Sequence, residues 1–338
     1  MLHEDPIGNF VMITKLSVSN FKSVRQLDIE CKKVNLFIGE PNTGKSNILE
    51  ALALMSWWAN PDRNLGDYVR YNQAMQNLFY DQLLDHEIQM SLFLSSGKPE
   101  VILHVRFVND RFELRSPSNT GARVITNYQG NFVGGQVVQQ TEDIKFFRFK
   151  NLMKHTDATP GTLKPPDGAN LFSVVFGSET LRETVREFFQ KYGLRLVLKP
   201  QEKLIELQKQ KDDLVFSYAY ALQSDTLRRI IFYTVAIASN KDSVLVFEEP
   251  ESNAFPYYTK YLGERIALDQ TNQFFIATHN PYLLSAIIEK SRKEDVQIFI
   301  TYFKDFQTRV KPLMPDQVVE LMEADPFFNL DHFIEEEE

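Results

Sequence analysis

The sequence has almost no cysteine. Cys31 is the single cysteine among 338 residues, so no internal disulfide can form, and this usage is typical of a reducing compartment. No apolar run approaches the roughly 20 residues that a membrane-spanning helix needs. The acidic start "MLHEDPIGNF" also lacks the apolar segment of a signal peptide. We therefore expect a cytoplasmic protein with no membrane contact, in which residues 1–11 form a loose N-terminal extension.

An excess of positive charge is also lacking. The formal net charge is −8, and the final "EEEE" contributes four of the negative charges. A broad basic surface for nucleic acid is therefore not expected, and unaided DNA binding should be weak and strongly dependent on salt. Internal repeats and a long heptad pattern are absent from the sequence as well, which argues against a coiled-coil arm.

A glycine-rich phosphate-binding loop is present near the N-terminus. The stretch "GEPNTGKS", residues 39–46, follows the apolar run "VNLFI" and precedes the helical pattern "KSNILEALALMSWWA". In this context Gly39 and Gly44 let backbone N–H groups turn inward and form an anion cradle with the helix N-terminus. Lys45 then reaches the β- and γ-phosphates, and the Ser46 hydroxyl ligates Mg²⁺. The pattern predicts a site for a nucleoside triphosphate with Mg²⁺, and it leaves open whether the phosphate is cleaved.

Two further polar motifs follow apolar strand patterns. In "SVLVFEEPES", Glu248 is placed to contact the Mg²⁺ shell, and Glu249 points differently, towards a water in line with the γ-phosphate. His279 follows "NQFFIAT" at the same edge of the expected sheet, where ligands bind in open α/β folds, and it can hydrogen-bond the γ-phosphate and the attacking water. Alone, such residues are more often solvated or structural groups. The phosphate-binding loop favours the functional interpretation and gives Lys45, Glu249 and His279 as the expected catalytic residues.

The periodicity along the chain predicts an α/β fold. Alternating helix and strand patterns near the C-terminus are typical of a parallel sheet. Residues 60–85 look helical, and residues 116–142, rich in Ser, Thr, Asn, Gly and Gln, look like loop with little strand. We expect five segments: the N-terminal extension (1–11), the first part of a nucleotide-binding head (12–60), a β-rich variable insertion (61–165), the second part of the head (166–310) and a helical acidic tail (311–338).

These segments together resemble a known family. "ITKLSVSNFKSV", "LFIGEPNTGKSNILEAL", "LVFEEPES" and "FFIATHNPYLL" are similar to the ABC-type ATPase heads of the RecF, SMC and OLD group, within the AAA-family ATPases. "LKPPDGANLFSVV" resembles a loop of the OLD-like and RecF-like members. The resemblance covers residues 12–55 and about 160–290. It implies a P-loop NTPase of ABC-ATPase type, with a mixed central sheet, flanking helices and an antiparallel β-rich subdomain.

The resemblance also implies roles for single residues. Glu248 takes the Walker B metal-side position, Glu249 that of the catalytic base and His279 that of the switch histidine, while Ser252 and Asn253 fall in the D-loop. The expected ATP-contacting residues are the Walker A loop, two residues where such heads approach the base, and two residues of the signature: Gly39, Glu40, Pro41, Asn42, Thr43, Gly44, Lys45, Ser46, Asn47, Asn20, Lys22, Ser224 and Asp225. The expected metal ligands are Ser46 and Glu248.

The signature departs from the family pattern. Family members open the helix before Walker B with Ser-x-Gly, whereas "ALQSDTLRRII" has Asp225 at the glycine position. The signature caps the γ-phosphate of the opposite subunit, so a carboxylate there would repel ATP unless it turns away or Ser224 and Thr226 take over. Walker B also reads Glu-Glu instead of Asp-Glu, which this group tolerates.

The expected function is hydrolysis of Mg-ATP at the interface of a homodimer that sandwiches the nucleotide. The resemblance implies a role in DNA repair or in defence against phage and plasmids. OLD proteins carry a Toprim nuclease domain with an Asp-x-Asp element after the head, and no Asp-x-Asp follows "THNPYLL" here. We therefore expect no DNA cleavage by this chain and a separate nuclease or effector as partner. The alternative is a nucleotide-gated interaction module with little or no turnover, which Asp225 favours.

Overall fold

The computed structural model describes residues 12–94, 101–117, 119–137, 141–323, 327 and 330–335. The expected loose extension at residues 1–11 lies outside these ranges. The helices and strands run in this order: β1 Ile13–Phe21, β2 Val24–Glu30, β3 Val34–Ile38, α1 Lys45–Trp58, β4 Ile88–Leu94, β5 Val101–Val108, β6 Arg111–Ser116, β7 Asn119–Thr126, β8 Phe132–Gln136, β9 Ile144–Phe147, α2 Leu171–Gly177, α3 Glu179–Gln190, β10 Arg195–Lys199, β11 Leu204–Lys211, β12 Leu214–Ala219, α4 Asp225–Ser239, β13 Val244–Glu248, α5 Pro256–Leu268, β14 Gln273–Ala277, α6 Pro281–Lys290, β15 Val296–Lys304, β16 Gln307–Pro312, α7 Pro315–Glu323 and α8 Leu330–Glu335.

A six-stranded central sheet has the strand order β16-β15-β3-β14-β13-β9. The five strands from β15 to β9 are parallel, and β16 pairs antiparallel with β15. This arrangement confirms the mixed central sheet. The strands β3, β13 and β14 are buried almost throughout, because helices cover both faces of the sheet, and such strands read as continuous apolar runs.

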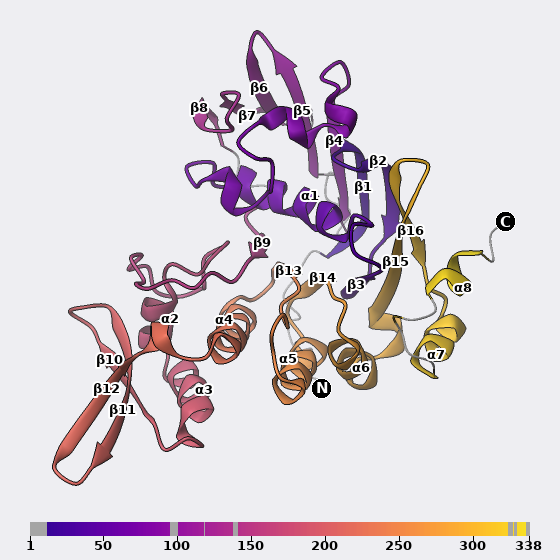
Figure 1. The fold of residues 1–338 in the computed structure, drawn as a ribbon. Coiled ribbons are helices and arrows are strands. Elements are labelled where there is room, and N and C mark those ends of the chain that lie inside the picture. Colours follow the sequence, from indigo (N-terminus) through magenta and orange to yellow (C-terminus); the bar gives the residue numbers. More distant parts are fainter. Residues whose placement is uncertain are drawn as a thin grey trace, which may run out of the picture.

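The helix α1 lies between two sheets (Figure 1). It contacts β9, β13 and β14 of the central sheet on one side and β1 of a second sheet on the other. This position explains why α1 is apolar on nearly every face. On the opposite face of the central sheet, α4, α5 and α6 pack in a second hydrophobic core.

The second sheet is antiparallel, with the order β2-β1-β4-β5-β6-β7-β8. The strands of the expected insertion therefore extend the sheet that β1 and β2 begin, while β9 joins the central sheet instead. The expectation of loop with little strand over residues 116–142 is wrong, because β7 and β8 lie there. In β7 the side chains of Ala122, Val124 and Thr126 are buried, while Arg123 between them is exposed, so the strand has the alternating burial of a sheet with one covered face.

The expectation of helix over residues 60–85 is also wrong. This segment forms short 3₁₀ turns at Leu65–Asp67, Met75–Leu78 and Tyr80–Gln82. Positive φ angles at Asn72 and Asp81 are among several that interrupt it, and L-residues in a helix do not adopt them. Its buried residues still recur at a near-helical spacing, among them Leu65, Tyr68, Met75 and Leu78, but these backbone turns break the helix and leave an irregular strap after α1.

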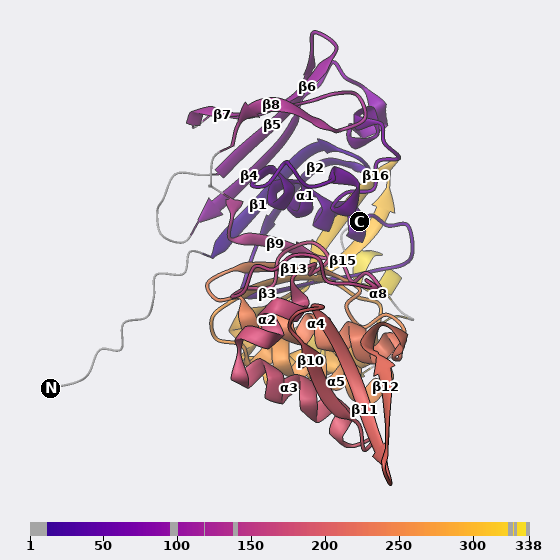
Figure 2. The same cartoon turned by 90° about the vertical axis from the view of Figure 1, so that its left-hand side faces the viewer.

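A small three-stranded sheet, β10-β11-β12, projects from the head with α2 and α3 beside it (Figure 2). Its three strands pair antiparallel in sequence order, β10 with β11 and β11 with β12. β12 leads directly through a short turn into α4, so this arm connects to the helix that carries the signature residues.

A fold prediction concerns Gly263, where α5 crosses α6. A Cβ added at Gly263 would lie 2.7 Å from Ala286 Cβ and 3.2 Å from Leu283 O. We expect Gly263→Val to lower the free energy of unfolding by about 1–3 kcal/mol, because it overpacks this crossing. Urea unfolding measures the change. The control is Gly134→Ala, since a Cβ at Gly134 meets no atom within 4 Å, and equal losses in both variants would contradict the close packing.

Candidate functional site

The Walker A loop after β3 needs glycine at two positions. Gly39 has φ of 150°, and a Cβ there would lie 2.2 Å from Thr301 O. Gly44 has φ of 101°, and its Cβ would lie 1.9 Å from Thr308 Oγ1. Any side chain at either position would collide with the two C-terminal strands, so the loop's close approach to β15 and β16 fixes both glycines.

Thr308 on β16 connects this loop to the turn between β1 and β2 by hydrogen bonds. Its hydroxyl donates to Thr43 O (3.0 Å) and lies 2.6 Å from Ser23 Oγ, which accepts a hydrogen bond from Asn47 Nδ2 (2.6 Å). The Asn47 side chain is therefore engaged with the turn between β1 and β2. Sequence reasoning missed Ser23 and Thr308, because each is an ordinary polar residue until the fold brings it to the loop.

Lys45 lies folded over its own loop. Its ammonium group donates to Gly39 O (2.6 Å) and Glu40 O (2.7 Å), and burial lowers its pKa against the opposing attraction of Glu249 and Glu40. Thr43 closes the loop by donating to Glu40 O (2.9 Å). The Lys45 ammonium group is thus bound by two carbonyl oxygens, which phosphate oxygens could replace as its partners. The loop residues Glu40, Pro41 and Asn42 are exposed.

The strand ends bring the three motifs to one edge of the sheet. Glu248 is opposite Ala277, which in turn is opposite Phe37, so β13, β14 and β3 end at the same level. Glu249 has φ of 43°, an uncommon conformation that turns its side chain away from that of Glu248. His279 Nδ1 lies 3.3 Å from Glu249 Oε1, and both side chains are about half exposed. Walker A, the two glutamates and the histidine are therefore neighbours.

Glu248 is held by two guanidinium groups. Its Oε2 accepts from Arg70 Nη2 at 2.8 Å and from Arg148 Nη2 at 3.0 Å. Burial disfavours the charged carboxylate, but Arg70, a hydrogen bond with Ser46 and Arg148 outweigh it and lower the pKa of Glu248. The expected metal ligands Ser46 and Glu248 are thus in contact, and the carboxylate is ionised at neutral pH.

A second carboxylate, Glu50 on α1, lies behind Glu248 and is fully buried. It pairs with Lys22, accepts from Arg148 Nη2 (3.2 Å) and accepts from the backbone N–H of Arg70 (3.2 Å). Three cationic side chains therefore surround two carboxylates. This excess of one positive charge favours binding of an anion beside Glu248.

Sequence reasoning missed Glu50, Arg70 and Arg148. A signal existed for two of them. Glu50 is the one acidic residue inside an otherwise apolar helix pattern, and Arg148 follows Phe147, which pairs with Phe247 in the parallel register just before Glu248. Arg70 lies on the irregular strap after α1 and has no such signal.

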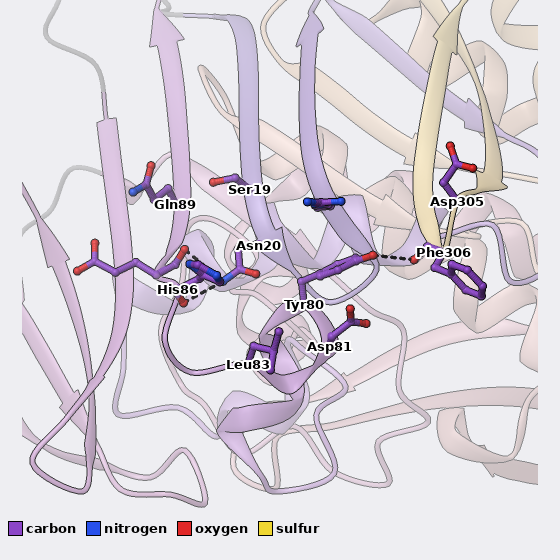
Figure 3. A pocket seen from close by; sticks show the side chains of 11 residues that line it. Ser19, Asn20, Tyr80, Asp81, Leu83, His86, Gln89, Asp305 and Phe306 are labelled. Atoms are coloured by element: carbon purple, nitrogen blue, oxygen red, sulfur yellow. Dashed lines mark hydrogen bonds between the residues drawn. The ribbon is translucent and has the colours of Figure 1, made fainter.

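Asn20 and Lys22 line different cavities. The larger cavity, about 870 Å³, has these labelled residues around it (Figure 3): Ser19, Asn20, Tyr80, Asp81, Leu83, His86, Gln89, Asp305 and Phe306. The Asn20 amide donates to His86 O (2.8 Å) there and anchors the start of β4. The second cavity, about 550 Å³, is lined by Lys22, Arg70, Asn77, Phe79, Asp81 and Gln82. It adjoins the Arg70–Glu248 contact, whereas the cavity of Asn20 lies beyond Asp81.

The three signature residues differ in their contacts, and the Asp225 side chain turns toward its own helix. Asp225 carries an Oδ1 atom 3.4 Å from Arg228 Nη2 and an Oδ2 atom 3.7 Å from Arg229 Nη2. The carboxylate is half exposed and partly neutralised by these arginines. Thr226 Oγ1 donates to Asn253 O (2.7 Å), which ties the signature helix to the D-loop. Ser224, at the N-cap of α4, makes no side-chain capping bond.

Comparisons with known proteins identify similar domains and similar folds. A family model described as "AAA ATPase domain" matches residues 12–155, and one described as "AAA domain, putative AbiEii toxin, Type IV TA system" matches residues 163–285. The fold matches an Smc head bound to the C-winged helix domain of ScpA, with a TM-score of 0.57, 13% identity, and coverage of 91% of this chain and 99% of that one. The chain therefore matches AAA-type ATPase domain models in two segments and has the fold of an Smc head.

A second Smc head has the same fold. It is the head domain with an extended coiled coil, bound to the C-terminal domain of ScpA from Pyrococcus furiosus, with a TM-score of 0.54, 12% identity, and coverage of 93% of this chain and 99% of that one. No curated protein matches the chain significantly. Every helix in the described part of the chain is too short or too polar to cross a lipid bilayer.

A prediction on pH follows from Glu251, whose side chain is 1% exposed. Burial raises its pKa to about 7, against the opposing hydrogen bond from Thr278. The folded state therefore holds a proton that the unfolded state releases near pH 4.5, and stability contributed by this group falls as pH rises from about 4.5 to 7. At pH 8 we expect the free energy of unfolding of Glu251→Gln to exceed that of wild type by on the order of 3 kcal/mol. Urea unfolding measures this difference as a higher midpoint.

At pH 5 the same two proteins should unfold at similar urea concentrations, because the carboxyl is largely neutral in the folded state. The comparison of the two pH values is the internal control. A Glu251→Gln variant that is less stable than wild type at pH 8 would contradict the prediction.

Proposed function

We propose that this ATPase head binds Mg-ATP and hydrolyses it at the interface of a homodimer. The observation that carries the proposal is the meeting of the Walker A loop, Glu248 and the Glu249–His279 pair at one sheet edge. Each group alone is common in proteins, whereas their arrangement around one position is that of a phosphate-cleaving site.

Each residue has a role in this proposal. Lys45 exchanges its two carbonyl partners for the β- and γ-phosphate oxygens. Glu249 accepts a proton from the attacking water, and His279, in contact with Glu249, donates a hydrogen bond to the γ-phosphate. Developing charge on the phosphate oxygens is stabilised by positioned cations and not by covalent catalysis.

The residues at Glu248 fit a magnesium ion. Ser46 and Glu248 offer hard oxygen ligands, and among the described residues no three His, Cys, Asp or Glu side chains converge on one point. Mg²⁺ is commonly held in this way, by one or two protein oxygens together with substrate phosphates and water. When bound, the ion supplies charge neutralisation at the β- and γ-phosphates.

At the Oε2 atom of Glu248, a metal ion would compete with two guanidinium groups for the same oxygen. The Arg70 side chain is 60% exposed and borders the cavity of Lys22, whereas that of Arg148 is 19% exposed and also bound by Glu50. Arg70 is therefore the residue that would leave Glu248, and it could then contact the phosphates or Glu50, whose Oε1 lies 3.9 Å from Arg70 Nη1.

Dimerisation completes the proposed site. Ser224 and Thr226 would face the γ-phosphate of the second subunit, since Asp225 is turned to the arginines of its own helix. We further propose that the ATP-bound dimer acts in DNA repair or in phage and plasmid defence through a separate nuclease or effector. The match to a family described as a putative AbiEii toxin and the resemblance to RecF and OLD heads support this setting.

The second candidate function is a nucleotide-gated interaction module with little turnover. The half-exposed Asp225 carboxylate favours it, because it keeps negative charge near where a partner's γ-phosphate would lie. Phosphate release by the pure wild-type protein separates the two functions. Nucleotide binding and dimerisation without phosphate release would support the module.

The main test is Glu249→Gln. The amide cannot accept the proton of the attacking water, so we expect turnover to fall by about 10²–10⁴-fold while ATP binding persists. Phosphate release and size-exclusion chromatography with light scattering measure turnover and the ATP-bound dimer. Lys45→Ala is the comparison, which should lose ATP binding itself. Wild-type turnover in Glu249→Gln would show that the base lies elsewhere.

A further prediction concerns the cation that competes with the metal. In a Glu249→Gln background, Arg70→Ala should lower the Mg²⁺ concentration needed for half-maximal binding of a fluorescent ATP analogue, because one guanidinium no longer occupies Glu248. Arg292→Ala is the control, since Arg292 is exposed and pairs with Asp295 away from this edge. An unchanged or higher Mg²⁺ requirement in Arg70→Ala would contradict the exchange.

A further inference from the structure

Glu251 is a buried carboxyl group that the proposed reaction does not use. It lies two residues after the proposed base, and its side chain turns inward while that of Glu249 turns to solvent. Its Oε1 accepts a hydrogen bond from Thr278 Oγ1. Its Oε2 is buried and has no hydrogen-bond partner. A carboxyl group in such a place is costly to bury, so the position needs a physical reason.

Two connections join the turn after β13 to the end of β14. The backbone N–H of Glu249 donates to Ala277 O (2.9 Å), and the side chain of Glu251 contacts Thr278. The first continues the sheet by one residue beyond Glu248. The second is a side-chain contact outside the sheet, and it joins the residue that precedes His279 to the turn that carries Glu249.

Thr278 is itself fixed on both sides. Its backbone N–H donates to Phe37 O (3.1 Å) on β3, and its Oγ1 accepts from the backbone N–H of Asn280 (3.0 Å). The Asn280 side chain caps α6 through Tyr282 N (2.9 Å). A shift of Thr278 would therefore move the neighbouring His279 relative to the sheet.

We propose that Glu251 and Thr278 form a positioning pair that holds the proposed base Glu249 and the switch histidine His279 at contact distance. The inference rests on the proposed function of Glu249 and His279. Neither member of the pair touches the nucleotide. Their contact sets the separation of the two groups that do, now 3.3 Å between Glu249 Oε1 and His279 Nδ1.

The surroundings of Glu251 explain why a hydroxyl is its partner. The charged groups that act on it are His279 and Glu249, and Tyr233 on α4 is a buried phenol near enough to be influenced by it. A lysine or arginine in the place of Thr278 would attract Glu249 and compete with His279. A threonine hydroxyl holds Glu251 without adding charge.

The test is a set of four variants at these two positions. Thr278→Val removes the hydroxyl at nearly constant shape, and Glu251→Ala removes the carboxyl. Both should lower kcat by about 10–100-fold, because a small misplacement of reacting groups has effects of this size, while the Kd for ATP stays within about twofold of wild type. Thr278→Ser and Glu251→Gln keep a contact and should stay within about threefold of the wild-type kcat.

Coupling between the positions is part of the prediction. Thr278→Val combined with Glu251→Ala should lower kcat no more than either variant alone, since both break one contact. Additive losses, an unchanged kcat in Thr278→Val, or a rise in the Kd for ATP equal to the loss in kcat would each overturn the positioning role. Circular dichroism and the urea midpoint identify a variant that fails to fold. In that case the kcat values of Thr278→Ser and Glu251→Gln are compared instead.

A readout independent of turnover separates this inference from the proposed function. The ¹⁵N chemical shifts of the His279 imidazole, assigned with a His279→Ala variant, should change in Thr278→Val and stay as in wild type in Thr278→Ser. If wild type releases no phosphate and the shifts still change in this way, the hydrolysis proposal fails and the positioning pair stands. Shifts that are the same in Thr278→Val and wild type would overturn the pair.

Discussion

The parallel register of β13, β14 and β3 is the constraint on which the site depends. Parallel strands end at the same edge, and here Glu248, Ala277 and Phe37 are aligned across three of them. The loops that follow these three strands therefore begin at the same edge of the sheet. Three segments that lie up to 240 residues apart in the sequence, from Gly39 to His279, therefore meet at one edge of the sheet. Helices on both faces protect these apolar strands from water.

The charge network around Glu248 follows from that geometry. β9 adds Arg148 beside Glu248 because Phe147 and Phe247 pair in register, and α1 places Glu50 behind both. Burying two carboxylates without partners would be strongly unfavourable, so Arg148 serves both of them. The cations then exceed the carboxylates when Lys22 and Arg70 are included. The structure holds this excess beside the Walker A loop, where the proposed function places the phosphates.

Local sequence patterns predicted those parts of the molecule whose signal is local. A strand, a glycine-rich loop and a helix in succession located the Walker A loop, and apolar runs ending in Glu248 and before His279 located the other two motifs. The head fold is confirmed by the structural comparisons. The strap over residues 60–85 was mispredicted as helix, because its buried residues recur at a near-helical spacing while its turns depend on positive φ angles that the sequence does not reveal. Thr308, Ser23 and Arg70 gain their roles through tertiary contacts only.

The D-loop is the segment in which these local contacts meet. At one end Glu251 is joined to Thr278 and through it to β14, β3 and α6. At the other end Asn253 accepts from Thr226 on the first turn of α4. A displacement at Glu249 or His279 therefore has a short covalent and hydrogen-bonded path to the signature helix. Since β12 of the projecting arm runs into the same helix, the arm is joined through α4 and the D-loop to the edge that carries Glu249 and His279.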